Sequence, residues 1–155
     1  MPTRDRTERV LPTLDQFPGR AAEQIRYGDL DPQGHVNNTV FATFFETGRV
    51  MLLREPKNLL NPPGATSVLA RLDINFVKEL HWPGAVEIGT GTLEIGRSSY
   101  TFLQAIFDAG GCAATARATM VMIDSATRRA RPLPEDVVAR LEVLRMREER
   151  VERGE

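Results

Sequence analysis

Hydrophobic residues recur at helical spacing in one stretch of the N-terminal half of the chain. Between residues 38 and 54 they fall three or four positions apart, at Val40, Phe41, Phe44, Phe45, Gly48 and Leu52. This period predicts one long helix from about Asn38 to Arg54. Glu55-Pro56 ends it, because proline cannot continue a helix and disfavours helical geometry in the residue before it.

Segments with the period of a strand lie on both sides of this helix. We expect strands at residues 22–28, 68–77, 86–95, 100–109 and 112–124. In the third of them the alternation changes phase near Gly89 and Gly91, which predicts a bulge or a strong bend. Gly110-Gly111 predicts a tight hairpin between the last two strands. One helix followed by four strands predicts an α+β domain in which a curved antiparallel sheet wraps around the helix.

The two ends of the chain differ from this core. Residues 1–20 mix charged residues with proline and glycine without any period, and we expect them to form a flexible N-terminal arm. The core domain is expected at residues 21–126. Residues 127–155 are expected to form a charged loop and then an amphipathic C-terminal helix from Pro134 to about Glu152.

Composition narrows the classes of partner. The chain has 155 residues, 41% of them hydrophobic, and a formal net charge of −1, which suits one globular domain and offers no basic tract for nucleic acid. The single cysteine, Cys112, favours a reducing compartment and reads as a buried structural thiol. The sequence shows no signal peptide and no membrane-spanning run, so we expect a cytoplasmic protein without membrane association. His35, His81 and Cys112 have no standard zinc spacing, and no metal site is expected.

The richest chemistry lies in the ten residues from Asp29 to Asn38, between the first strand and the helix. They include two carboxylates, a glycine turn and a histidine, and Asn37 or Asn38 can cap the helix. Free N–H groups and the helix dipole attract negative charge at a helix N-terminus. A carboxylate beside such a terminus suits attack on a carbonyl group, with amides to hold the oxyanion.

The segment Ile25–Asn38, followed by Phe44-Phe45-Glu46 and Arg49, resembles the hotdog-fold acyl-CoA thioesterases of the 4-hydroxybenzoyl-CoA thioesterase type. The likeness covers roughly residues 20 to 125. It implies hydrolysis of an acyl-CoA thioester to a carboxylic acid and CoA, with no cofactor. In related enzymes the second aspartate of Asp-x-Asp, here Asp31, is the catalytic carboxylate, either as a nucleophile or as the base for a water.

Other residues take their expected roles from this resemblance. His35 is an auxiliary catalytic candidate, and a backbone amide of the first helical turn, with Asn38 favoured, would polarise the thioester oxygen. Val36, Asn37 and Thr39 are expected to contact the substrate mainly through their backbone amides. Arg128 and Arg129 are the best candidates for the phosphates of CoA, since guanidinium groups bind phosphate through paired hydrogen bonds.

Three alternatives stay open at this point. Some hotdog thioesterases use a carboxylate on the helix, which makes Glu46 a second candidate, although an intrahelical ion pair with Arg49 is its simplest role. A non-catalytic, regulatory acyl-CoA-binding protein is the alternative function. A single sheet leaves an open edge strand, and hotdog proteins of this type pair such edges, so the resemblance implies a homodimer or homotetramer with the sites at the seam between subunits.

Overall fold

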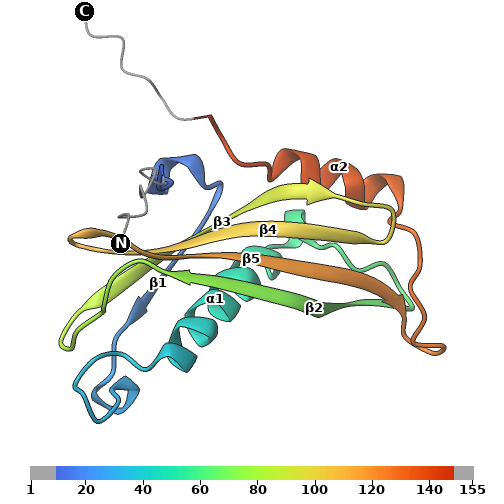
Figure 1. Cartoon of the computed structure of the whole chain (residues 1–155). Coiled ribbons are helices and arrows are strands. Elements are labelled where there is room, and N and C mark those ends of the chain that lie inside the picture. The colour runs from blue at the N-terminus through green and yellow to red at the C-terminus, as the bar shows by residue number, and fades with distance from the viewer. Residues whose placement is uncertain (1–9, 149–155) are drawn as a thin grey trace, which may run out of the picture.

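One long helix lies across a curved antiparallel sheet in the computed structural model, which describes residues 10–148 (Figure 1). The sheet has five strands in the order β1-β3-β4-β5-β2. The elements in chain order are β1 (Gly19–Gln24), α1 (Asn38–Leu53), β2 (Ala65–Phe76), β3 (Ala85–Ile95), β4 (Ser99–Asp108), β5 (Gly111–Asp124) and α2 (Glu135–Val143). The predicted α+β architecture is therefore confirmed.

The helix α1 packs on the sheet through its apolar face. Phe41, Phe44 and Phe45 are buried there, and they pack with Ile88 of β3 and Ile106 of β4. A second cluster joins the C-terminal end of α1 at Leu52 to Phe102 of β4 and Leu141 of α2. The predicted limits of the helix agree with the structure within one residue.

The strands after the helix fall close to their predicted positions, but β1 begins and ends earlier than expected. Beyond Gln24 the chain leaves the strand, and residues 27–29 form a short 3-10 turn that leads into the motif loop. The irregularity predicted near Gly89 and Gly91 lies slightly later, where the register of β3 against β4 shifts between Thr92 and Glu94.

The glycines of β3 serve a close approach instead of a bulge. A Cβ atom at Gly89 would lie 2.4 Å from the ring of Phe17, which is fully buried. Val10 is 88% exposed, whereas Phe17 and Gly19 are buried and β1 begins at Gly19, so the flexible arm expected for residues 1–20 does not extend this far. The reason is the anchoring of Phe17, whose ring also meets Phe107 edge to face at 6.1 Å. The remaining residues of that arm, 1–9, lie outside the described part of the chain.

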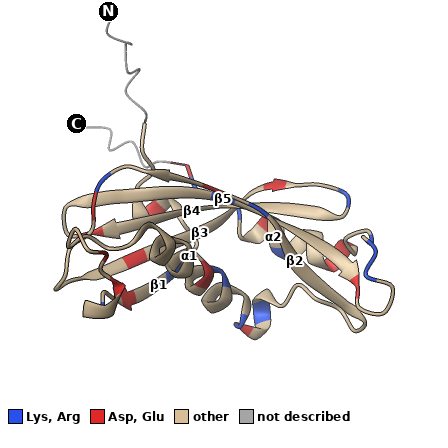
Figure 2. Ribbon diagram, turned by 60° about the horizontal axis from the view of Figure 1, so that its bottom comes forward, with Lys and Arg blue, Asp and Glu red and all other residues tan. Residues whose placement is uncertain are grey.

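The C-terminal helix is shorter than predicted. α2 ends at Val143, and Arg145 then forms a parallel bridge with Thr92 of β3. The predicted part of the helix beyond residue 148 lies outside the described residues. None of the described helices is long and apolar enough to cross a membrane. Figure 2 shows acidic and basic residues interspersed along the visible elements.

A tight contact between α1 and the sheet generates the first prediction. A Cβ atom at Gly48 would lie 2.6 Å from Cγ2 of Ile88 and 3.0 Å from Nε2 of Gln104. Alanine is the better helix former by about 1 kcal/mol, yet overpacking of a core costs about 1 to 3 kcal/mol. We expect Gly48→Ala to lower the free energy of unfolding in urea, whereas Thr43→Ala at an exposed position of the same helix leaves it nearly unchanged. A more stable Gly48→Ala protein would contradict this packing.

Candidate active site

The motif loop is closed by its own backbone. The N–H of Asp31 donates to the carbonyl of His35 at 2.8 Å, and the N–H of Gly34 donates to the carbonyl of Asp31 at 3.0 Å. Gly34 has φ of 83°, a left-handed conformation that glycine adopts without steric cost. Asp29 fixes the start of the loop by accepting the backbone N–H of Arg26 at 2.8 Å. Asp29 therefore serves the structure of the loop.

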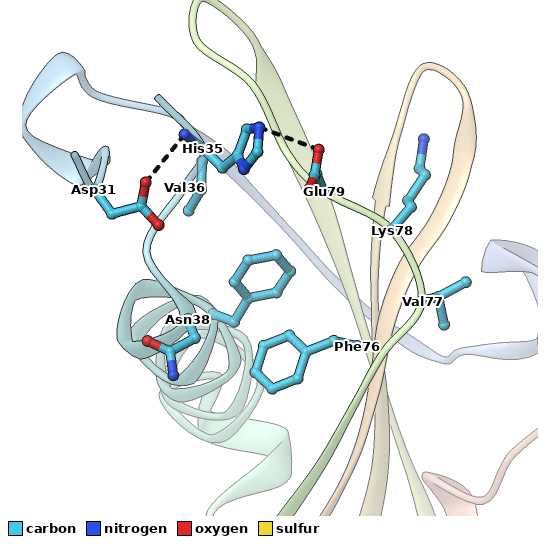
Figure 3. Close-up of a pocket in the computed structure, with 9 residues that line it drawn as sticks. Asp31, His35, Val36, Asn38, Phe76, Val77, Lys78 and Glu79 are labelled. Atoms are coloured by element: carbon cyan, nitrogen blue, oxygen red, sulfur yellow. Dashed lines mark hydrogen bonds and ion pairs between the residues drawn. The ribbon is translucent and has the colours of Figure 1, made fainter. Parts of the chain in front are cut away.

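One of the two carboxylate oxygens of Asp31 is hydrogen-bonded within this loop. Its Oδ1 accepts the backbone N–H of Gln33 at 2.9 Å and that of His35 at 3.3 Å. Within residues 10–148, no hydrogen bond reaches the other oxygen, Oδ2, and Figure 3 shows it on the side of the loop that faces the start of α1. One oxygen thus orients the side chain, and the other is available to a substrate.

The backbone amides of residues 36 to 40 differ in whether they have a hydrogen-bond acceptor. Val36 donates to the carbonyl of Leu80, Asn37 to that of Asp29, and Val40 to that of Asn37, each at 2.9 Å. The side chain of Asn37 caps the helix by accepting the N–H of Thr39 at 2.9 Å. The N–H of Asn38 has no acceptor among the described residues. It is the one unpaired amide in this run.

A pocket of about 360 Å³ opens over these groups (Figure 3). Four of the predicted site residues line it, namely Asp31, His35, Val36 and Asn38. Phe41 of α1 and Phe76 of β2 form an apolar wall, with their rings edge to face at 5.1 Å. The pocket therefore joins an apolar wall to a free carboxylate oxygen and a free amide. Asn37 and Thr39 lie outside its lining, and their amides are already paired.

The polar rim of the pocket comes from residues after β2. Lys78 lines it and forms an ion pair with Asp108. Partial burial would raise the pKa of Asp108, but hydrogen bonds from Lys78 and from the N–H of Gly110 outweigh it, and the pKa lies below its usual value. The positive charge of Lys78 at the mouth of the pocket is therefore balanced by the carboxylate of Asp108.

Glu79 is the site residue that sequence reasoning missed. Its Oε2 lies 3.2 Å from Nε2 of His35 and 3.8 Å from Nε2 of His81. The rings of these two histidines meet at 5.2 Å and nearly at right angles, with an interplanar angle of 86°. No local pattern indicates the contact between Glu79 and His35, because Glu79 stands 44 positions after His35 and reaches it only through the fold.

Other candidates lie elsewhere. Arg128 and Arg129 follow β5, near the pairing of Ala65 with Asp124, whereas the pocket adjoins the other end of the same strand pair, where Phe76 faces Ala114. One chain therefore does not bring these arginines to the pocket, and their contact with CoA stays a prediction.

The structure argues against a catalytic role for Glu46 and for Cys112. Glu46 is exposed on α1 and lies outside the pocket lining. Arg49 is buried and donates to Oε1 of Gln104 at 3.1 Å, instead of forming the expected ion pair with Glu46. Burial raises the pKa of the Cys112 thiol, which disfavours the reactive thiolate. Within residues 10–148, no group of three or more histidine, cysteine or acidic side chains could hold a metal ion.

Comparison with known proteins bears on this site. The family model of the thioesterase-like superfamily matches residues 25–141, from the start of the motif to α2. The chain belongs to this superfamily. No curated protein matches the sequence at a significant level.

Solved structures of the thioesterase fold are similar to this chain over most of its length. A thioesterase of Thermus thermophilus, solved with coenzyme A and zinc, is 29% identical, with a TM-score of 0.74 over 84% of this chain and 96% of its own. The PA5185 protein of Pseudomonas aeruginosa is 23% identical, with a TM-score of 0.77 over 87% of this chain and 96% of its own. The DHNA-CoA thioesterase of Staphylococcus aureus is 21% identical, with a TM-score of 0.70 over 81% and 91%. The last two likenesses concern the fold alone.

Proposed function

We propose that this thioesterase-like protein hydrolyses acyl-CoA thioesters to a carboxylic acid and CoA. One observation carries the proposal: a carboxylate oxygen of Asp31 and the N–H of Asn38, neither of which has a hydrogen-bond partner among the described residues, belong to residues that line the same pocket. The superfamily assignment and the coenzyme A in the Thermus thermophilus thioesterase support this substrate class.

Two routes use the same groups. Asp31 can accept a proton from a water that attacks the thioester carbon. Alternatively, its Oδ2 attacks that carbon, and a water then opens the resulting mixed anhydride. In both routes the carbonyl oxygen becomes an oxyanion, and the C–S bond breaks to release the CoA thiolate. The N–H of Asn38 at the N-terminus of α1 is the donor for that oxyanion.

The first test of this function replaces the acid group. Asp31→Asn keeps the size of the side chain and an acceptor for the loop amides, but it removes the base or nucleophile. We expect kcat in a thiol-release assay over a panel of acyl-CoAs to fall at least roughly a hundredfold, while acyl-CoA binding survives. Glu46→Gln is the matched control and retains turnover. The reverse pattern would assign catalysis to Glu46, and binding without turnover by the wild type would favour the regulatory acyl-CoA-binding role.

The second test removes the oxyanion donor. Asn38→Pro deletes one N–H at the first position of a helix, where proline is well tolerated. Asn37 already has φ of −58° and ψ of 138°, the extended geometry that a residue before proline prefers. We expect a large fall in kcat with a nearly unchanged melting temperature. Asn38→Ala, which keeps the N–H, is the control and retains activity; an unchanged kcat in Asn38→Pro would place the oxyanion donor elsewhere.

We further propose that the active form is at least a homodimer paired through β2. β2 is an edge of the sheet, and an open strand edge is a ready template for pairing with another chain. Two large apolar side chains on it are exposed, Leu69 at 43% and Phe76 at 53%. Phe76 also lines the pocket, so a second copy at this edge would help to enclose the site.

We expect sedimentation velocity at micromolar concentration to give a dimer or a tetramer. Pairing along β2 would bury apolar surface that is exposed in one chain, and this burial favours association. Sedimentation as a monomer alone at that concentration would contradict the proposal.

A further inference from the structure

The two histidines of the chain converge on one carboxylate at the rim of the pocket. We propose that Glu79 is a positioning residue that holds the imidazole of His35 over the reacting groups. This inference rests on the proposed thioester hydrolysis and adds a residue to it. Glu79 acts through His35, and the ring of His35 is the group that meets the reacting water.

The contact with Glu79 favours one orientation and one tautomer of the neutral ring. Oε2 of Glu79 lies 3.2 Å from Nε2 of His35, so in the neutral imidazole the proton resides on Nε2 and points at the carboxylate. The second nitrogen, Nδ1, is then an acceptor, and Figure 3 shows it on the side of the ring that faces the pocket. The ring of His81 also meets that of His35 edge to face.

The backbone places this ring close to the acid group. The N–H of His35 donates to Oδ1 of Asp31, so the two residues are tied together within the loop. The N–H of Val36 donates to the carbonyl of Leu80, which ties the loop to the segment that carries Glu79. Glu79 thus lies beside His35 because neighbouring residues are joined by main-chain hydrogen bonds. Side-chain flexibility alone does not bring them together.

The role of the ring follows from its free nitrogen. Nδ1 accepts a hydrogen bond from the water that attacks either the thioester or the anhydride, and it orients that water for reaction. No proton needs to leave Glu79, and its carboxylate only accepts. Loss of Glu79 frees the ring to rotate, which lowers the rate of chemistry more than it weakens substrate binding.

A double-mutant cycle tests this dependence. We expect Glu79→Ala to lower kcat about tenfold, the effect of one lost hydrogen bond to a charged group, with KM nearly unchanged. His35→Ala lowers kcat at least as much, and the double variant is no slower than His35→Ala. Glu79→Gln retains most of the activity, because its amide oxygen still accepts from Nε2–H. Glu87→Ala, an exposed glutamate on β3, is the matched control and leaves kcat unchanged.

Two kinetic outcomes would overturn the inference. Glu79→Ala could leave kcat unchanged, or it could lower kcat by the same factor in the His35→Ala background, which would show that Glu79 acts independently of His35. Melting temperatures of all variants, measured alongside, identify any that fail to fold, and Glu79→Gln then supplies the comparison.

Nuclear magnetic resonance of protein labelled with ¹⁵N-histidine separates this inference from the proposed function. The chain has two histidines, so a spectrum of His81→Asn assigns the signals of His35. We expect Glu79→Ala to change the nitrogen shifts of His35 and Glu79→Gln to restore them in large part. Unchanged shifts in Glu79→Ala would refute the positioning role even in an active enzyme. Absence of turnover by the wild type on every thioester would refute the function, whatever the shifts.

Discussion

The N-terminus of α1 carries backbone donors that the helix cannot pair, and the shape of the site depends on how they are satisfied. The side chain of Asn37 accepts a hydrogen bond from the N–H of Thr39, and the carbonyl of Asp29 accepts one from the N–H of Asn37. These bonds bend the motif loop back over the helix and leave the N–H of Asn38 as the remaining donor. Asn38 is an exposed residue at the pocket, and in the proposed hydrolysis its N–H would donate to a substrate oxygen.

The position of that terminus depends in turn on a buried polar contact between α1 and the sheet. Gln104 of β4 donates to the carbonyl of Phe45 and to Oγ1 of Thr90, both at 2.9 Å, and accepts from Arg49. Burial lowers the pKa of Arg49, although the nearby charge of Glu46 opposes this effect. Because a buried polar group must keep its partners, the helix cannot slide along the sheet without losing these bonds. This network fixes α1 in register with the sheet, and the pocket lies at the N-terminal end of the same helix.

The sequence predicted those parts of the molecule that short-range patterns determine. The helix was recognisable from its phenylalanines, and the motif loop from its carboxylates and its glycine, since these signals lie within a few residues of one another. The burial of Phe17 was missed, because it depends on Gly89, 72 positions away. Glu79 was missed for the same reason: no local pattern distinguishes a glutamate in the loop after a strand from surface charge. Arg128 and Arg129 form a basic cluster in sequence, yet the length of β5 separates them from the pocket of their own chain.

The two walls of the pocket are therefore under different constraints. One wall is the motif loop, where hydrogen bonds between near neighbours fix Asp31 and the amide of Asn38. The other wall is the end of an edge strand, where Phe76 is more than half exposed and no further strand within residues 10–148 covers it. Substitutions on that strand can reshape the apolar wall without touching the loop that would perform the chemistry. Under the proposed hydrolysis, acyl preference could consequently vary along β2 while Asp31 and the amide of Asn38 stay in place, but any surface that pairs with β2 would have to accommodate the same side chains.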